Sequence, residues 1–180
     1  MDPPPVIRAV FLDRDDTLLD DEGYMNDPAR VRLLPGVADA LRRLHRRGLR
    51  LVLVSNQSGV ARGLITRPQV EQIQRRMCEL LAGVQFAAFE YCFHHPDEGC
   101  PCRKPAPAMI LRAARRLGLD PRRAVMVGDR ESDVEAGNAA GCWTVLLAHR
   151  DRAESTAADH VAPDLGAAAD WILALQRPRT

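Results

Sequence analysis

Short apolar segments of strand length alternate with segments of helical periodicity along almost the whole chain. Runs of apolar residues predict buried strands over 7–12, 51–54, 86–92, 124–127 and 144–147. Apolar residues at intervals of three or four predict helices between them, over 37–44, 70–81, 110–117 and 134–140. An edge strand is expected over 160–165, and a closing helix over 167–175. Strands that alternate with helices through short connections form a parallel sheet, so we expect a three-layer, Rossmann-like α/β fold with helices on both faces.

The chain is long enough for one well-packed hydrophobic core. It has 180 residues, of which 46% are hydrophobic, and neither an internal repeat nor a low-complexity linker divides it. We therefore expect a single domain over 1–180, with a loose proline-rich tail at 1–5. No sustained heptad or additional apolar stripe calls for assembly, so a monomer is expected.

The charge balance argues against several classes of protein. Twenty-five basic and 24 acidic residues give a net charge of +1, whereas a nucleic-acid-binding protein needs a surplus of basic charge on one face. The arginine clusters fall on the polar sides of predicted helices, which is typical of a solvated face. No apolar run reaches the ~20 residues of a membrane span, and the first residues, MDPPPVIR, lack the features of a signal peptide. We expect a cytoplasmic protein that binds neither nucleic acid nor membrane.

Six carboxylates crowd the end of the first predicted strand, in the segment AVFLDRDDTLLDDEGYM. Asp13 and Asp15 directly follow this strand, and Asp129 follows the strand at 124–127. Because reactive groups in such folds lie beyond the carboxyl ends of the strands, these acids are expected to converge at one edge of the sheet. Carboxylates this close repel one another unless a cation or a proton intervenes. Asp13 and Asp129, together with a backbone carbonyl, would offer the oxygen ligands that Mg²⁺ prefers, and such an ion also binds a substrate phosphate.

Residues at the other predicted strand ends suit phosphoryl transfer. Ser55 and Asn56 offer hydrogen-bond donors to a phosphate oxygen. Gly59 would let backbone N–H groups approach that phosphate closely. Lys104 supplies a positive charge that, together with Mg²⁺, would neutralise the phosphate oxygens.

Two acids of the first cluster fit the two chemical roles of this reaction. Asp13 could attack phosphorus, because carboxylates are nucleophiles that form acyl phosphates. Asp15, protonated beside the phosphate, could give its proton to the leaving oxygen and later take one from water. Each residue alone also has an ordinary explanation: an aspartate after a strand usually serves a turn, and Asp133 fits the start of a helix. Only the combination of the four strand ends favours catalysis.

Several short segments carry a resemblance to a known family. DRDDT, SNQSG, CRKP and GDRESD resemble the four motifs of the haloacid dehalogenase superfamily of phosphatases. GYM, NQSGVARG and the Cys/His segment before CRKP are similar to the branch that holds D-glycero-D-manno-heptose 1,7-bisphosphate phosphatases and histidinol-phosphate phosphatases. The similarity covers about residues 6–148. It implies a haloacid dehalogenase-like fold without a large cap domain, and a Mg²⁺-dependent phosphatase acting on a small phosphorylated metabolite.

The resemblance also implies roles for individual residues. Asp13 would be the nucleophile and Asp15 the general acid and base, while Ser55 and Lys104 would stabilise the phosphoryl group. The implied Mg²⁺ ligands are Asp13, Asp15 and Asp129. Substrate contacts are implied for Arg14, Asp21, Glu22, Gly23, Tyr24, Asn56, Gln57, Ser58, Arg103 and Arg130. NQSGVARG and GYM favour the 7-phosphate of heptose bisphosphate as substrate, whereas the five-residue gap between His94 and Cys100 also occurs in histidinol phosphatases.

Asp16 stands where the family pattern has glycine. Aspartate tolerates the left-handed backbone of a tight turn better than most residues, but at some cost. A charge aimed at the site would repel a phosphate. We expect the Asp16 side chain to point to solvent, so that Asp16→Gly leaves turnover the same or faster. The alternative is a degenerate enzyme that Asp16 has silenced.

A cysteine- and histidine-rich segment lies between the third predicted strand and CRKP. Cys92, His94, Cys100 and Cys102 form C-x-H-x5-C-x-C, a closed set of four ligands that suits structural Zn²⁺. Such an ion would pin the loop 92–102, which leads directly into Arg103 and Lys104. The neighbouring His95 is expected to face solvent or substrate. The two remaining cysteines are expected to be small buried apolar residues, at Cys78 and Cys142.

Two other classes of function compete with the phosphatase hypothesis. A phospho-acceptor signalling domain also carries an aspartate after a strand of a doubly wound sheet, but its acceptor normally stands alone and it has no need of a zinc loop. A zinc-stabilised nucleic-acid-binding module is disfavoured by the balanced charge and by an aromatic content of only 4%. Release of phosphate from a sugar phosphate would separate the first class from an enzyme.

Overall fold

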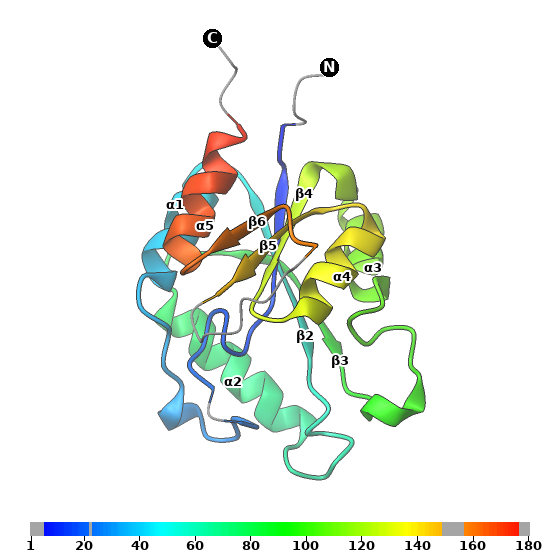
Figure 1. Cartoon of the computed structure of the whole chain (residues 1–180). Coiled ribbons are helices and arrows are strands. Elements are labelled where there is room, and N and C mark those ends of the chain that lie inside the picture. Colours follow the sequence, from blue (N-terminus) through cyan, green and yellow to red (C-terminus); the bar gives the residue numbers. More distant parts are fainter. Residues whose placement is uncertain (1–5, 22, 149–156, 177–180) are drawn as a thin grey trace.

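A single parallel sheet forms the centre of the protein. The computed structural model describes residues 6–21, 23–148 and 157–176, and within them six strands follow the order β3-β2-β1-β4-β5-β6 (Figure 1). The strands are β1 (Ala9–Leu12), β2 (Arg50–Asn56), β3 (Phe86–Cys92), β4 (Ala124–Gly128), β5 (Trp143–Leu147) and β6 (His160–Ala162). Every predicted strand is present, and the sequence 160–165 supplies the edge strand β6.

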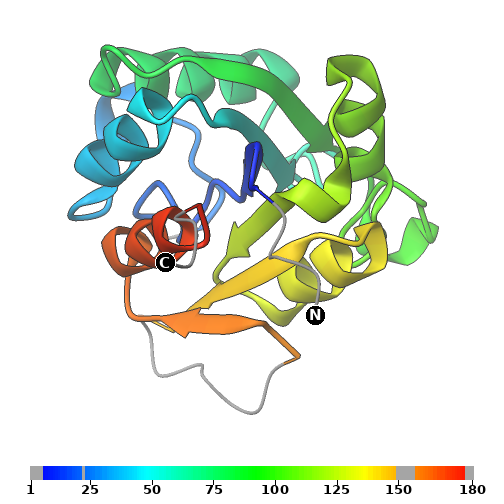
Figure 2. The same cartoon turned by 90° about the horizontal axis from the view of Figure 1, so that it is seen from above.

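Helices cover both faces of this sheet (Figure 2). On one face lie α1 (Val37–Arg46), α2 (Arg67–Leu80) and α5 (Leu165–Ala174), and on the other α3 (Ala108–Leu117) and α4 (Glu131–Ala140). Alternate residues of β1 separate the two cores: Val10 and Leu12 pack toward the first set, Ala9 and Phe11 toward the second. The predicted three-layer α/β fold is therefore confirmed.

Local sequence signals explain where the helices begin and end. The Thr66 side chain accepts a hydrogen bond from the Gln69 backbone and Gln69 reaches back to Thr66, so this capping box starts α2 at Arg67, earlier than apolar periodicity alone predicts. Gly118 ends α3 in the left-handed conformation, as its position predicts.

The strand order places the ends of β1 and β4 side by side. From β1 the chain proceeds outward to β2 and β3, and then returns to β4 on the other side of β1. Leu12 lies opposite Val127, and the Asp13 N–H donates to the Val127 carbonyl at 3.0 Å. The crevice beyond the carboxyl ends of β1 and β4 is thus the switch point at which α/β sheets bind ligands.

The connections at this edge contain little regular secondary structure. Those that follow β1 and β3 contain only single 3₁₀ turns, Pro28–Arg30 and Pro96–Glu98, so the described residues include no cap-sized insertion. None of the helices in the described ranges has the length and apolar character needed to cross a bilayer. The expected tail at 1–5 lies outside the described residues, and the cytoplasmic location and monomeric state stay predictions.

Candidate active site

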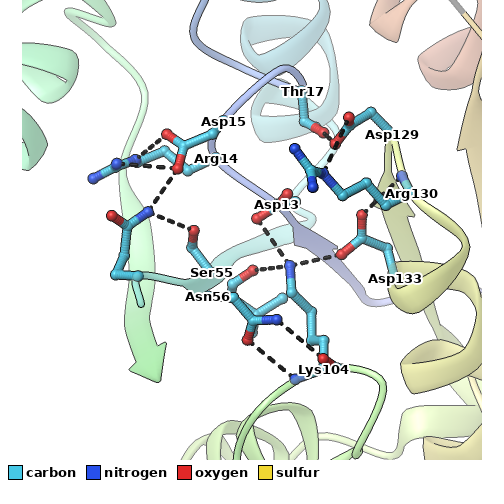
Figure 3. A network of polar contacts seen from close by, with 12 residues as sticks. Asp13, Arg14, Asp15, Thr17, Ser55, Asn56, Lys104, Asp129, Arg130 and Asp133 are labelled. Atoms are coloured by element: carbon cyan, nitrogen blue, oxygen red, sulfur yellow. Dashed lines mark hydrogen bonds and ion pairs between the residues drawn. The ribbon is translucent and has the colours of Figure 1, made fainter. Parts of the chain in front are cut away.

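Three buried carboxylates meet at the switch point of the sheet (Figure 3). Asp13 follows β1, Asp129 follows β4, and Asp133 belongs to the first turn of α4. One oxygen from each lies within 4.8 Å of the others. Oxygen-only ligand sets of this kind fit Mg²⁺, so the donor chemistry agrees with the predicted metal site.

Asp133 reaches this cluster because β4 ends in a glycine. A side-chain carbon on Gly128 would overlap the Asp133 carboxyl group. The Asp133 Oδ2 also accepts a hydrogen bond from the Arg130 backbone N–H at 3.1 Å, which caps α4. The sequence interpretation of Asp133 as a helix cap is therefore correct but incomplete. Asp133 stands four residues after Asp129, at the start of the helix, and this spacing was the feature of the sequence that could have predicted its place in the cluster.

Lys104 is the buried cation of the cluster. Its Nζ lies 2.8 Å from Asp13 Oδ1 and 2.6 Å from Asp133 Oδ1, and it donates to the Val54 carbonyl at 2.9 Å. These three contacts match the three N–H groups of an ammonium ion. Two strands and a helix thereby hold the Lys104 charge next to the expected nucleophile.

Asn56 fixes the loop that carries Lys104. Its Nδ2 donates to the Lys104 carbonyl at 3.0 Å, and its Oδ1 accepts from the Lys104 N–H at 3.1 Å. From its place after a strand, this amide is expected to contact phosphate or substrate. In the structure it lines the cavity, but its polar atoms bind the Lys104 backbone, because β2 and this loop run side by side here.

Burial and mutual repulsion shift the pKa values of these groups. Burial, together with the like charges of Asp133 and Asp15, raises the pKa of Asp13 to about 7, although Lys104 opposes the shift. Burial and Asp133 raise the pKa of Asp129 to about 6, against the opposing effect of Arg130. Burial by itself would lower the pKa of Lys104, but the carboxylates of Asp13 and Asp133 outweigh it and raise this pKa. The site therefore favours a bound cation.

Asp15 occupies a separate position beside this cluster. Its carboxylate accepts from Arg14 Nε at 2.6 Å and from Gln57 Nε2 at 2.7 Å, and Gln57 also donates to Ser55 Oγ at 3.0 Å. The three-carboxylate cluster contains Asp133 and not the Asp15 side chain, which Arg14 and Gln57 hold beside it. A backbone carbonyl is the expected partner of Asp13 and Asp129, and the place of Asp15 in the Mg²⁺ ligand set stays a prediction.

A cavity of about 610 Å³ opens above these residues. Most of the residues predicted to contact substrate line it: Asp21, Gly23, Tyr24, Asn56, Gln57, Ser58, Arg103 and Arg130. Glu22 lies outside the described residues. Arg14 does not line the cavity, because its side chain is only 1% exposed and points behind Asp15, so its predicted substrate contact is corrected. Four further lining residues had no role predicted from the sequence: Arg62, Pro96, Pro105 and Ser132.

Tyr24 and Gly59 join two walls of this cavity. A side-chain carbon on Gly59 would overlap the Tyr24 ring and the Ile65 side chain. The glycine is therefore required for contact between the two loops. This is a different role from the one predicted from the sequence, where Gly59 was expected to let backbone N–H groups approach a phosphate. Tyr24 itself has a left-handed backbone with φ of 48°.

The four predicted zinc ligands come together in the loop that follows β3. The ligand atoms of Cys92, His94, Cys100 and Cys102 all lie within 4.8 Å of one another. His94 Nδ1 is 3.5 Å from Cys92 Sγ and 3.4 Å from Cys102 Sγ. These distances match the ~3.5 Å S···N edge of a tetrahedron with Zn–S near 2.3 Å and Zn–N near 2.0–2.1 Å. The residues thus fit a structural Zn²⁺.

The remaining histidine and cysteines of the sequence analysis lie outside this cluster. His95 caps the 3₁₀ turn at Pro96–Glu98 by accepting from the Asp97 N–H at 3.3 Å. Cys142 is buried as predicted, whereas Cys78 is only half-buried.

Comparison with known proteins identifies the family. The sequence family described as haloacid dehalogenase-like hydrolase matches residues 22–141. A D-glycero-beta-D-manno-heptose-1,7-bisphosphate 7-phosphatase from Yersinia pestis is 39% identical over 176 residues, covering 93% of this chain and 90% of its own. The chain belongs to the haloacid dehalogenase-like hydrolases.

Other members of the haloacid dehalogenase-like hydrolases agree with this assignment. The corresponding 7-phosphatase from Haemophilus influenzae is 43% identical over 138 residues, covering 72% of this chain and 75% of its own. The crystal structure of D,D-heptose 1,7-bisphosphate phosphatase from B. bronchiseptica, complexed with magnesium and phosphate, has a TM-score of 0.85 and 33% identity. That alignment covers 93% of this chain and 99% of the other.

Asp16 departs from the glycine of the haloacid dehalogenase-like pattern. Its backbone is left-handed, with φ of 56°, as the glycine position suggested. The prediction that its side chain points to solvent is wrong: Asp16 is 5% exposed and lines the cavity. Its charge contributes to the raised pKa values of Asp129 and Asp21. The turn directs this side chain inward, which the sequence spacing did not indicate.

This inward charge sharpens the prediction for Asp16→Gly. Removing a carboxylate that lines the cavity should reduce repulsion of an anionic substrate by about 1 kcal/mol, which corresponds to a kcat/KM about 5- to 10-fold higher. Asp16→Asn removes the charge but keeps the side chain, and should give a similar gain. Steady-state kinetics of both variants would test this, and a fall of tenfold or more in kcat for either would show that the carboxylate has a positive role.

Proposed function

We propose that this protein hydrolyses the 7-phosphate of D-glycero-β-D-manno-heptose 1,7-bisphosphate, with Mg²⁺ and through a phosphoaspartate on Asp13. The observation that carries the chemistry is the cluster of Asp13, Asp129 and Asp133 at the switch point of the sheet, with the Lys104 ammonium against Asp13 and Asp133. The substrate is inferred from the names of relatives that align over most of the chain. Asp13 and Asp129, with Asp133 beside them, would hold the Mg²⁺, which supplies positive charge to the phosphoryl oxygens.

In the first half-reaction, Asp13 attacks phosphorus and the ester bond breaks. The Asp13 carboxylate oxygen forms the new P–O bond as the sugar oxygen leaves. Asp15 donates its proton to that leaving oxygen. Lys104 and the Ser55 hydroxyl neutralise charge on the oxygens of the phosphoryl group in transit, which is the main contribution that a protein makes to phosphoryl transfer.

In the second half-reaction, water releases the phosphate. Asp15, now ionised, takes a proton from water while the water oxygen attacks phosphorus and the bond to Asp13 breaks. Asp13 returns to its original state and inorganic phosphate leaves. A phospho-acceptor domain would stop before this step, so turnover distinguishes the two classes.

The rim of the cavity favours a substrate with two phosphates. Besides the buried Lys104, three arginine side chains line the cavity: Arg62, Arg103 and Arg130. One phosphate at the Asp13 end leaves Arg62 and Arg103 for a second anion, whereas Arg130 Nε lies 3.7 Å from Asp129 Oδ2. Histidinol phosphate carries an ammonium group at its far end, which the same arginines would repel.

A phosphate-release screen tests this proposal. Both anomers of heptose 1,7-bisphosphate, histidinol phosphate and common sugar phosphates are assayed with Mg²⁺ and with EDTA. The β-anomer of the bisphosphate should give the highest kcat/KM, and EDTA should abolish the activity. Preference for histidinol phosphate would contradict the proposed substrate, and absence of phosphate release from every ester would contradict the enzymatic proposal.

We also propose that Zn²⁺ bound by Cys92, His94, Cys100 and Cys102 keeps Lys104 in place. Cys102 is separated from Lys104 by a single residue, and the Arg103 N–H donates to the Cys100 carbonyl at 3.2 Å. The backbone of Lys104 lies outside regular secondary structure, so the metal-bound loop and Asn56 are the main supports of that backbone. Zn²⁺ would do no chemistry itself.

Removal of zinc should therefore lower both stability and turnover. We expect the free energy of unfolding to fall by about 2–3 kcal/mol, equivalent to a melting temperature about 4–12 °C lower, with a loss of at least tenfold in kcat. Thermal melts and kinetics after chelation are measured with Mg²⁺ restored, so that loss of Mg²⁺ does not contribute. Cys100→Ser should reproduce the effect and Cys78→Ser should not. Full activity and an unchanged melting temperature in zinc-stripped protein would contradict the proposed support.

The affinity for Mg²⁺ should rise with pH. Because the pKa values of Asp13 and Asp129 are raised to about 7 and about 6, both groups hold protons in acid solution that an ion must displace. We expect the apparent affinity to increase about 10²- to 10³-fold between pH 5 and pH 8, measured by calorimetry in buffers of different ionisation enthalpy. Without metal, these carboxyl groups have a pKa of 3.8 in the unfolded chain and a higher pKa in the folded protein. The unfolded chain therefore loses their protons first, so the free energy of unfolding should fall as pH rises from about 4 to 7. An affinity independent of pH would contradict both expectations.

A further inference from the structure

Arg14 is buried next to Asp15 and away from the cavity. Its side chain is 1% exposed and does not line the cavity. Its Nε donates to Asp15 Oδ1 at 2.6 Å and its Nη2 to Asp15 Oδ2 at 3.2 Å, which is a bidentate pair (Figure 3). Such a pair fixes the plane of a carboxylate as well as its position.

Gln57 holds the same carboxylate from the neighbouring strand end. Its Nε2 donates to Asp15 Oδ2 at 2.7 Å and contacts Ser55 Oγ at 3.0 Å. Asp15 thus accepts hydrogen bonds from Arg14, just after β1, and from Gln57, just after β2. A protonated carboxyl still accepts hydrogen bonds through its remaining lone pairs, so these contacts can orient Asp15 in either protonation state.

The burial of Arg14 is unusual within this protein. No other arginine among the described residues is buried. Glu90 is also buried and paired with arginines, but Arg112 and Arg116 remain 46% and 57% exposed and reach it from the surface. Desolvation of a guanidinium is costly, so a structural ion pair alone gives no reason to bury the cation at this position.

We propose that Arg14, together with Gln57, is a positioning residue that aims the Asp15 carboxyl at the leaving oxygen, and that Arg14 does not contact the substrate. The inference rests on the proposed function, in which Asp15 gives its proton to the sugar oxygen as the P–O ester bond breaks and the bond from Asp13 forms. Misplacement of Asp15 would slow that proton transfer. It would matter only for a leaving group that needs the proton.

The leaving group therefore supplies the test. An alkyl phosphate such as heptose 1,7-bisphosphate releases a strongly basic oxygen, whereas p-nitrophenyl phosphate releases a stable phenolate that needs no proton. We use kcat/KM for both, because it reports only steps up to release of the leaving group. In Arg14→Lys and Arg14→Gln we expect kcat/KM to fall about 10²-fold for the alkyl phosphate and less than threefold for the aryl phosphate.

Two controls separate positioning from general damage. Arg112→Lys alters the matched Arg–Glu pair outside the cavity, and should change both rates less than twofold. In the Asp15→Asn background, Arg14→Lys should have no further effect on the alkyl phosphate, because Arg14 acts only through Asp15. If the Arg14 variants do not fold, as circular dichroism would show, Gln57→Ala should lower the same alkyl-to-aryl ratio.

Four other outcomes would overturn the inference, and one would overturn only the proposed substrate. Equal losses on both esters would make Arg14 merely structural. A raised KM for the bisphosphate with unchanged kcat would make it a substrate contact. Unchanged rates in the variants would show that Asp15 needs no such support. If the wild type hydrolyses another alkyl phosphate but not the bisphosphate, the proposed substrate fails while the ratio still tests Arg14. If the wild type hydrolyses only aryl phosphates, Asp15 has no leaving oxygen that needs its proton. The inference would then fail.

Discussion

Asp13→Asn should reduce turnover by at least about 10⁴-fold. The amide is close in size to the carboxylate but cannot form an acyl phosphate, so the covalent step is lost. The protein should remain folded, because burial beside Asp133 and Asp15 already disfavours the charge that the substitution removes. Phosphate release and acid-quenched labelling with radioactive substrate measure the two consequences. No labelled protein should be recovered from this variant.

A surface carboxylate provides the matched control for Asp13→Asn. Asp39 lies on α1 with its side chain 70% exposed, so Asp39→Asn should keep full turnover. Labelled protein from Asp13→Asn at the wild-type level would place the phosphoryl group on another residue. Turnover within tenfold of the wild type would remove covalent catalysis by Asp13 from the mechanism.

Lys104→Met should have the largest effect on stability. The substitution leaves Asp13 and Asp133 buried without the cation that lies 2.8 and 2.6 Å from them. Breaking a buried ion pair on one side typically costs about 3–5 kcal/mol, and we expect a loss of that size in the free energy of unfolding at pH 7.5. Turnover should fall at least about 10³-fold, because the phosphoryl oxygens also lose this positive charge.

The pH dependence of the Lys104→Met defect distinguishes charge from packing. At pH 5 the two carboxyls can take up protons in the folded state, so the loss of stability should be smaller than at pH 7.5. Denaturant unfolding in EDTA at both pH values measures the difference. Arg43→Met removes the cation of an exposed pair with Asp170 and should cost less than about 1 kcal/mol. A Lys104→Met defect that is equal at both pH values would point to lost packing.

Most of the fold was predictable because its signals are local. The apolar run 51–54 lies inside β2, the run 124–127 is β4 without its last residue, and the segment 86–92 became β3 without change of bounds. The predicted helix ends were less accurate where a polar cap extends the helix beyond its apolar face, as Thr66 does for α2. Such caps contribute little to periodicity, so an apolar pattern misses them.

The candidate site was predictable only in part. Asp13, Asp129 and Lys104 follow strands or motifs that lead to one edge of the sheet, and the structure brings them together there. The Arg14 side chain was expected to face the substrate but is buried away from the cavity, and the Asp16 side chain was expected to face solvent but lines the cavity. Their neighbours in sequence gave no information on this point, because side chains in an irregular turn do not alternate as they do in a strand.

The sequence by itself determined the order of strands and helices, and therefore which residues stand at the carboxyl ends of strands. That information is local, since it depends on apolar periodicity and on motifs of a few residues. Only the tertiary structure decided that Asp133 joins the carboxylate cluster, that Asn56 holds the Lys104 backbone, and that Arg14 turns behind Asp15. These outcomes depend on contacts between segments as far apart in sequence as Asp13 and Asp133, where packing and charge pairing select one side-chain direction from several that the local chain allows.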